Sequence, residues 1–230
     1  MLQDLRYSLR QLRKSPGFTI VVILTLAVGI GAVTTVVTWA NAVMFNPWPQ
    51  VREAQRLRFM SAVTSNGGGY SQHYDQLQYL RQNARNFSDL TANEIAAYDL
   101  AGSGSVAQRY WGGVVASNYF QFLGVQPVLG RGFTPQDDRA YGSAPEVVIS
   151  YDLWHARFHG DPAILGKAIQ VNRHPLTVVG VAPKGFAGIY GGLAQSLWAP
   201  LSELAEMTGR PDPWSPETSG CRLQCACDRV

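Results

Sequence analysis

The sequence predicts an α+β protein, with one N-terminal transmembrane helix followed by a mixed extracytoplasmic domain. Three observations lead to this prediction. No Asp, Glu, Lys or Arg occurs between Lys14 and Arg52, a short basic segment precedes this stretch, and short apolar segments separated by turn residues follow it. Charged residues make up only 15% of the 230 residues, against roughly 25% in a typical soluble protein.

The uncharged stretch is long enough to cross a bilayer. Residues 18–44 read FTIVVILTLAVGIGAVTTVVTWANAVM, and a helix spans the hydrocarbon core in about 20 residues. A cleaved signal peptide is the competing interpretation, but its apolar core is about 7–15 residues long and ends in small residues. This run is longer and ends at Met44 and Phe45. A buried soluble helix would need apolar cover on every side. We therefore predict a transmembrane helix over 17–46.

The charges on either side of the span predict its orientation. The segment before it contains one acidic residue, Asp4, and four basic ones: Arg6, Arg10, Arg13 and Lys14. After the span, basic residues begin only at Arg52. Because basic flanks favour the cytoplasmic side, the N-terminus is expected inside. The sequence thus predicts a single-pass inner-membrane protein whose main domain faces the periplasm or the exterior.

Residues 1–16 are predicted to form a cytoplasmic amphipathic helix. Leucines recur at steps of three and four residues, and the arginines occupy another face. Such a helix can lie in the membrane interface without any partner, or it can contact a cytoplasmic protein. The residues that would make this contact are Leu5, Arg6, Leu9, Arg10 and Leu12.

A patch of small residues lies inside the predicted span. It contains Ala27, Gly29 and Gly31, of which Ala27 and Gly31 are four residues apart and share one face. Small residues let helix backbones approach closely in lipid, so the patch predicts packing against other transmembrane helices. Chance is the alternative, because Gly and Ala are common in spans.

The part of the chain over 50–205 is predicted to be one mixed domain. Strands are expected over 57–63, 87–100, 109–116, 147–150, 167–171, 176–181 and 196–201. Helices are expected from Ser71 to Asn83, from Ser117 or Asn118 to Leu123, and from Ser150 or Asp152 to Gly160. Residues 172–175, Asn-Arg-His-Pro, predict a hairpin turn. Because helices and strands do not alternate strictly, the domain fits the α+β class.

The last segment, 206–230, is predicted to be a divergent, disordered tail. From residue 211 it reads PDPWSPETSGCRLQCACDRV, which lacks apolar periodicity. Cys221, Cys225 and Cys227 offer three thiolates, whereas a structural zinc site usually needs four ligands. A disulfide or a free tail is therefore preferred over a metal site.

No pattern in the chain predicts catalysis. Residues 161–168, DPAILGKA, lack the first Gly and the final Ser or Thr of a P-loop, and no Gly-x-Ser-x-Gly elbow is present. His155 and His159 are four residues apart but have no third ligand nearby. We predict no enzyme activity and no cofactor.

The acidic and basic residues give little support to two other kinds of binding. Asp137, Asp138 and Glu146 could form a calcium cluster, but a solvated loop is the simpler interpretation, so no metal site is predicted. The net charge of +3 is small, and beyond Arg58 no stretch clusters basic residues with aromatic ones. Nucleic acid is therefore not an expected partner.

Several stretches, taken together, resemble MacB/FtsX-type ABC transporter permeases of the orphan permease group. The N-terminal stretch is DLRYSLRQLRKSPGFTIVVILTLAVGIGAVTTVVTWANAVMFNPWP. The stretches VASNYFQFLGVQPVLGRGFTPQDD, VVISYDLWHARFHGDPAILGKAIQVN and LTVVGVAPKGFAG are similar to the MacB-like periplasmic core domain. The resemblance covers roughly residues 1–205.

This resemblance implies a permease subunit that works with a separate ABC ATPase, with residues 2–14 near the nucleotide-binding subunit. It also implies a homodimer or contact with other permease helices, and a periplasmic domain that passes force. The family has four or eight spans, whereas nothing after Met44 could cross a bilayer, so we expect a truncated or frame-shifted product. Two alternatives remain: a membrane-anchored periplasmic binding or sensor module without transport activity, and a non-functional gene remnant.

Overall fold

The structure is a computed structural model, which describes residues 15–45, 48, 50–60, 62–63, 69–70, 74–83, 87–102, 105–138, 142, 144–190, 192–208 and 224–229. The chain forms two compact units, Met1–Pro47 and Trp48–Val230.

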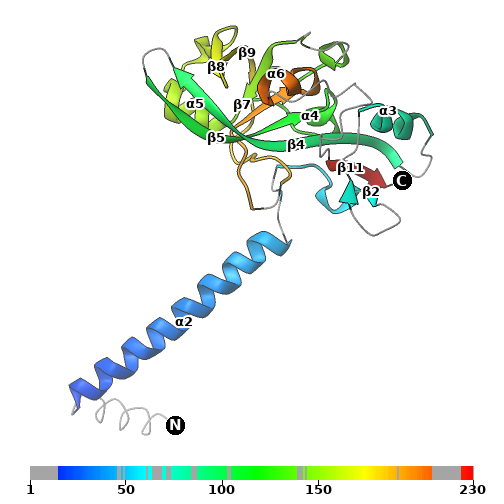
Figure 1. Ribbon diagram of the computed structural model, residues 1–230. Helices are drawn as coiled ribbons and strands as arrows, with labels where there is room; N and C mark the ends of the chain where they lie inside the picture. Colours follow the sequence, from blue (N-terminus) through cyan, green and yellow to red (C-terminus); the bar gives the residue numbers. More distant parts are fainter. Residues whose placement is uncertain are drawn as a thin grey trace. The chain divides into compact units, whose positions relative to one another are not determined.

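The first unit contains one long helix, α2 (Pro16–Phe45) (Figure 1). Proline suits the first turn because the backbone N–H there needs no helical partner. The segment Pro16–Ala40 is long and apolar enough to cross a membrane, and its apolar window is not buried in the protein. A core helix of a soluble protein would be covered by other elements. The helix matches the predicted span, 17–46, to within one residue at each end, whereas residues 1–14 lie outside the described part of the chain.

The second unit is built on a mixed sheet. In the described residues its strands follow the order β1-β11-β4-β5-β10-β7-β9-β6, and β8 pairs with β4 and β9. The strand bounds are β1 Leu57–Met60, β4 Phe87–Gly102, β5 Ser105–Val115, β6 Leu129–Gly130, β7 Glu146–Ile149, β8 Ala168–Val171, β9 His174–Val181, β10 Leu197–Pro200 and β11 Gln224–Arg229. A separate small sheet pairs β2 (Ala62–Val63) with β3 (Gly69–Tyr70).

Short helices accompany the sheet: α3 Tyr74–Asn83, α4 Tyr119–Phe122, α5 Tyr151–Phe158 and α6 Leu204–Thr208, with 3-10 turns η1 Ala54–Arg56, η2 Pro135–Asp138, η3 Pro162–Ile164 and η4 Leu201–Glu203. Figure 1 shows α3 and β11 near one end of the long strand β4, and α5 and β8 near the other. Strand pairs β5–β10 and β7–β9 are parallel, and the others are antiparallel. This mixture confirms the predicted α+β class.

Local sequence signals place several elements correctly. The hairpin between β8 and β9 turns at Asn172 and Arg173, whose φ angles of 48° and 70° are both left-handed. Two positive φ angles in succession are what a two-residue hairpin turn requires, so the predicted hairpin is confirmed. Helix α5 follows Ser150, whose side chain accepts a hydrogen bond from the Leu153 N–H at 3.1 Å, as expected for an N-cap.

The sheet has a hydrophobic core on each face. Because side chains alternate along a strand, Leu90, Ala92, Tyr98 and Leu100 of β4 enter one core, which α5 and α6 cover through residues such as Leu153 and Met207. The other core is aromatic, and its largest members are Tyr119, Phe120, Phe133, Phe186 and Trp198. The chain between β9 and β10 and the turn at α4 cover this second face.

The predicted disordered tail is wrong for two segments. Helix α6 (Leu204–Thr208) continues through residues 206–208 of the predicted tail, where Met207 is buried, and Gln224–Arg229 form strand β11. Strand β11 pairs antiparallel with both β1 and β4. Backbone N–H and C=O groups make this pairing, and they need no apolar periodicity. The sequence pattern therefore carried no signal for β11.

Candidate functional site

The surface of α2 is suited to lipid. Its threonine hydroxyls donate to carbonyls four residues earlier: Thr25 to Val21 at 2.8 Å and Thr35 to Gly31 at 2.8 Å, with Thr34 bonded in the same way to Ile30. These side-chain polar groups are therefore satisfied within the helix, and burying an unsatisfied polar group in hydrocarbon would cost several kcal/mol. The helix can enter a bilayer without polar partners from elsewhere for these hydroxyls.

The three small residues predicted for helix packing do not share one face of α2. Successive residues turn by about 100° around a helix, so Ala27 and Gly31 lie together and Gly29 lies on the other side. Gly29 lines a shallow groove whose other members are Thr25, Leu26, Ile30, Val33, Thr34 and Val37. A Cβ at Gly29 or Gly31 would meet no atom within 4 Å. Their role in helix packing stays a prediction, now divided between two surfaces.

The predicted contact residues Leu5, Arg6, Leu9, Arg10 and Leu12 lie outside the described residues, as does Cys221. The backbone of Cys225 and Cys227 belongs to β11. Among the described residues, no three His, Cys, Asp or Glu side chains are grouped so as to hold a metal ion.

The two histidines considered for a metal lie apart in their local structure. His155 is on α5 and stacks against Tyr151, with ring centroids 4.4 Å apart. His159 follows the helix with a left-handed φ of 56° and caps it through a bond from its N–H to the Trp154 carbonyl. The second histidine therefore no longer follows the helical spacing that would place it beside the first.

The second unit opens with a segment, Trp48–Phe59, that we call the entry segment. Its two ends meet, because the Trp48 and Phe59 rings lie 5.5 Å apart. The Arg52 N–H donates to the Leu123 carbonyl at 2.9 Å, which attaches the segment to the turn after α4. Val51 and Leu57 are buried in the aromatic core, while Phe59 remains 43% exposed. The entry segment is thus fixed to the domain at several points.

Strand β1, at the end of the entry segment, joins the sheet through β11. Its four residues pair with residues 225–228, and β11 in turn pairs with β4. Within the described part of the chain, β1 has no other strand as a neighbour. The segment that follows the span is therefore connected to the central strands by a strand from the far end of the chain.

A buried network of hydrogen-bonded side chains lies between the central strands. The Trp198 indole N–H donates to Oε1 of Gln195 at 3.1 Å, and Nε2 of Gln195 donates to Oδ1 of Asn93 at 3.4 Å. A Cβ at Gly113 would lie 2.5 Å from Nε2 of Gln195, and one at Gly188 would lie 1.8 Å from Oε1. Side chains are thus excluded from both glycines, and the network joins β4 and β10 to the chain that precedes β10.

A second polar network joins α3 to the sheet. The Arg81 guanidinium donates to the Leu90 carbonyl at 2.8 Å and to Oδ1 of Asn118 at 2.7 Å. Asn118 in turn donates to Oδ2 of Asp89 at 2.9 Å. Asn118 was a predicted helix cap, but its side chain makes no cap hydrogen bond and instead bridges α3, β4 and α4.

The solvated loop predicted around the acidic residues is wrong for Asp137 and Asp138, which are both buried. Oδ2 of Asp137 accepts from the Thr134 N–H at 2.7 Å and from Arg131 at 3.0 Å, and Arg131 also binds both carboxylate oxygens of Glu146 at 2.7 Å. Oδ2 of Asp138 accepts from the Ser117 N–H at 2.6 Å. These carboxylates accept hydrogen bonds from backbone N–H groups and from a guanidinium. The sequence alone did not reveal these partners.

Burial raises the pKa of Asp138 above its usual value, although the Ser117 N–H and the charge of Arg81 oppose the shift. A raised folded-state pKa contributes stability below the unfolded pKa of about 3.9, and this contribution is lost as the pH rises through the folded pKa. We expect Asp138→Asn to gain stability relative to the parent between pH 4 and pH 7, measured as the difference in urea midpoint.

The matched control is Asp161→Asn, because the pKa of Asp161 is shifted in the opposite direction. Asp161 is exposed, and its pKa is lowered, chiefly by the hydrogen bond from the Ala163 N–H. Its contribution is present above the unfolded pKa and is lost as the pH falls through the folded pKa. Between pH 4 and pH 7 the stability of Asp161→Asn should therefore differ from that of the parent by a constant amount, and the difference should shrink only as the pH falls below about 4. If the stability difference from the parent had the same slope against pH for both variants, the raised pKa of Asp138 would be contradicted.

The fold and these networks define an α+β domain that follows one helix able to span a membrane. The chain belongs to the family of the MacB-like periplasmic core domain, whose model matches residues 19–219. This match confirms the resemblance seen in the sequence and extends it into the tail. Strand β11 begins beyond its end.

Two solved structures are similar to the chain. The periplasmic region of MacB from Actinobacillus actinomycetemcomitans is 16% identical with a TM-score of 0.55, and the match covers 82% of this chain and 79% of that one. The extracellular domain of the noncanonic ABC-type transporter YknZ from Gram-positive bacteria is 15% identical with a TM-score of 0.55, covering 75% and 81%. A search of curated proteins found no match.

Proposed function

We propose that the chain is a membrane-anchored permease subunit whose extracytoplasmic domain responds to ATP hydrolysis by a separate ABC ATPase. The observation that carries the proposal is the order of its two units. A charge-free helix with an exposed apolar surface precedes the mixed sheet, and the match to the MacB-like periplasmic family covers most of both, from residue 19 to residue 219. MacB-like permease domains in general work with ABC ATPase partners, which supports a separate ATPase as the source of the movement.

The proposed orientation places residues 1–14 in the cytoplasm and Trp48–Val230 outside the inner membrane. The basic flank before α2 supports it, as does the periplasmic domain family. A fusion that places a reporter after residue 205 tests it: alkaline phosphatase should be active there and a cytoplasmic reporter inactive. The reverse pattern would show that the orientation is wrong.

The proposed contact with the ATPase is through the leucine face of residues 2–14. We expect the triple change Leu5→Asp, Leu9→Asp and Leu12→Asp to abolish co-purification with an ATPase subunit, because three carboxylates on an apolar helix face would oppose burial against a partner. The measurement is the amount of ATPase retained by the tagged full chain in detergent.

The control for this change is Gln3→Asp, Tyr7→Asp and Gln11→Asp. It adds the same three charges at steps of four residues on the opposite face of the predicted helix. Association should survive in this variant. If both triple variants retain the ATPase equally, the leucine face is not the contact surface. If both variants lose the ATPase, association depends on the charge of residues 2–14 and not on one face of the helix.

A further inference from the structure

The entry segment combines exposed aromatic and basic side chains at the point where the domain begins. Phe59 is 43% exposed beside Trp48, and Arg52, Arg56 and Arg58 are exposed along the same short stretch. The only acidic residue among them is Glu53, which pairs with Arg56 at 2.8 Å. The segment therefore carries a net positive charge next to an exposed aromatic ring.

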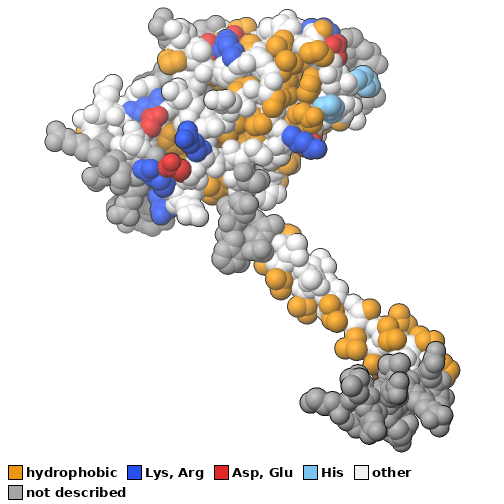
Figure 2. Space-filling model, turned by 180° about the vertical axis from the view of Figure 1, so that it is seen from behind, with side chains coloured by type: hydrophobic (Ala, Val, Ile, Leu, Met, Phe, Trp, Pro, Cys, Tyr) orange, Lys and Arg blue, Asp and Glu red, His pale blue; other side chains and the backbone are white. Residues whose placement is uncertain are grey.

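Backbone carbonyls hold the side chain of Arg58 against the domain surface. Arg58 donates to the carbonyls of Gln55 and Leu57 at 2.8 and 2.9 Å, and the buried Leu57 holds β1 against the aromatic core. The edge of the domain that carries β11, right in Figure 1 and left in Figure 2, shows several basic side chains among fewer acidic ones. A rigid surface of this composition requires no folding of the segment before it binds.

Three features identify the partner by its chemistry. Trp48 follows the last residue of α2, Phe45, by only three residues, and three residues span at most about 10 Å. Aromatic rings favour the headgroup level of a bilayer. Arginines are attracted to anionic headgroups and can lay their alkyl stems on apolar surface. Each feature favours a lipid surface, and the short link ties the start of the segment to the end of the proposed anchor.

We propose that the entry segment, through Phe59 and the arginines Arg52, Arg56 and Arg58, docks onto anionic phospholipid headgroups of the outer leaflet. This inference rests on the proposed membrane anchor formed by α2. The docked segment would hold β1 at the bilayer surface, and β11 would connect it to β4 and the rest of the sheet.

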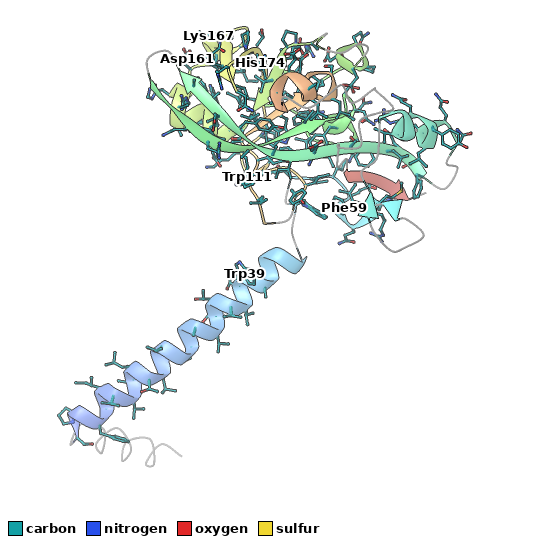
Figure 3. The ribbon with its side chains drawn as sticks, in the orientation of Figure 1. Trp39, Phe59, Trp111, Asp161, Lys167 and His174 are labelled. Atoms are coloured by element: carbon teal, nitrogen blue, oxygen red, sulfur yellow. The ribbon has the colours of Figure 1, made fainter. Side chains whose placement is uncertain are left out.

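The experiment uses the full chain in nanodiscs containing equal amounts of phosphatidylcholine and phosphatidylglycerol. Phe59 is replaced by the photoreactive residue p-benzoylphenylalanine, and lipid adducts are identified by mass after illumination. Lys167 receives the same residue as a control, because Figure 3 shows it at the opposite side of the domain from Phe59. We expect adducts at position 59, enriched in phosphatidylglycerol, and none at 167.

A charge variant tests the role of the arginines. Changing Arg52, Arg56 and Arg58 to Gln should reduce the ratio of phosphatidylglycerol to phosphatidylcholine adducts about tenfold or more, because each basic residue near an anionic surface contributes about a factor of five. The matched control changes Arg157, Lys167 and Arg173 to Gln, which should leave the ratio unchanged. Equal ratios in the two variants would overturn the role of the three arginines.

The remaining outcomes separate this inference from the proposed function. A chain that enters the nanodisc but yields no lipid adduct at position 59, or yields an adduct with a second protein chain, overturns the docking surface and leaves the anchor intact. A chain that fails to co-elute with the nanodisc overturns the anchor itself, and the docking surface with it.

Discussion

Replacing Trp198 by alanine is expected to lower the stability of the domain by about 3–5 kcal/mol, the usual range for removing a fully buried large aromatic side chain. The Trp198 side chain is fully buried, with its ring 5.1 Å from Phe186 and 5.8 Å from Phe120. The change would also leave Oε1 of Gln195 without its indole donor. Lost packing and a lost buried hydrogen bond act in the same direction.

Urea unfolding of the full chain in detergent, followed by far-UV circular dichroism, measures this loss. With a urea dependence of about 1–3 kcal/mol per molar, the midpoint should fall by more than 1 M. The control is Trp111→Ala, which removes an indole of the same size from the same sheet, where it is 44% exposed. Replacing a tryptophan at this exposed site should lower the free energy of unfolding by about 1 kcal/mol or less. Similar shifts for the two variants would show that Trp198 is not a central packing residue.

The elements that sequence predicted correctly are those whose signals are local. The β8–β9 turn depends on two adjacent residues that tolerate left-handed backbone angles. Helix α5 begins after a serine whose side chain accepts a hydrogen bond from the backbone N–H three residues later. The span depends on the absence of charge over one continuous stretch. In each case neighbouring residues alone supply the physical cause, so no knowledge of the rest of the fold is needed.

The features that sequence missed depend on residues distant in the chain. Strand β11 is held by backbone pairing with β1 and β4, and nothing in QCACDR encodes which strands flank it. Asp138 looks like a loop residue until the Ser117 N–H is placed 2.6 Å from its carboxylate. Gln195, too, reads as an ordinary polar loop residue. Its burial follows from Asn93 and Trp198, which only the folded sheet brings to it.

The patch of small residues shows how far a helical periodicity argument reaches. Ala27 and Gly31, four residues apart, share one face of α2, and the helical turn of about 100° per residue places Gly29 on the other side. A Cβ at Gly29 or Gly31 would meet no atom within 4 Å. Their role in helix packing therefore stays a prediction.

Two arginines at the centre of α2 are expected to prevent stable membrane insertion. Ile30→Arg and Val33→Arg place charges near the middle of Pro16–Phe45, where each arginine costs about 2.5–3.5 kcal/mol of insertion free energy and the pair about 5–7 kcal/mol. Their side chains lie too far from either end of the helix for both charged groups to reach water easily. The protein should therefore move from the carbonate-resistant membrane fraction to the soluble or aggregated fraction.

The control places the same two charges at the start of the helix, as Gly17→Arg and Phe18→Arg. Long basic side chains at a helix end can extend to the headgroups, and extra positive charge there agrees with a cytoplasmic N-terminus, so this variant should remain in the membrane. If the central variant stays carbonate-resistant as well, α2 does not cross the hydrocarbon core. The uncharged helix would then serve only as a surface element, and neither the anchor nor the docking of the entry segment could hold.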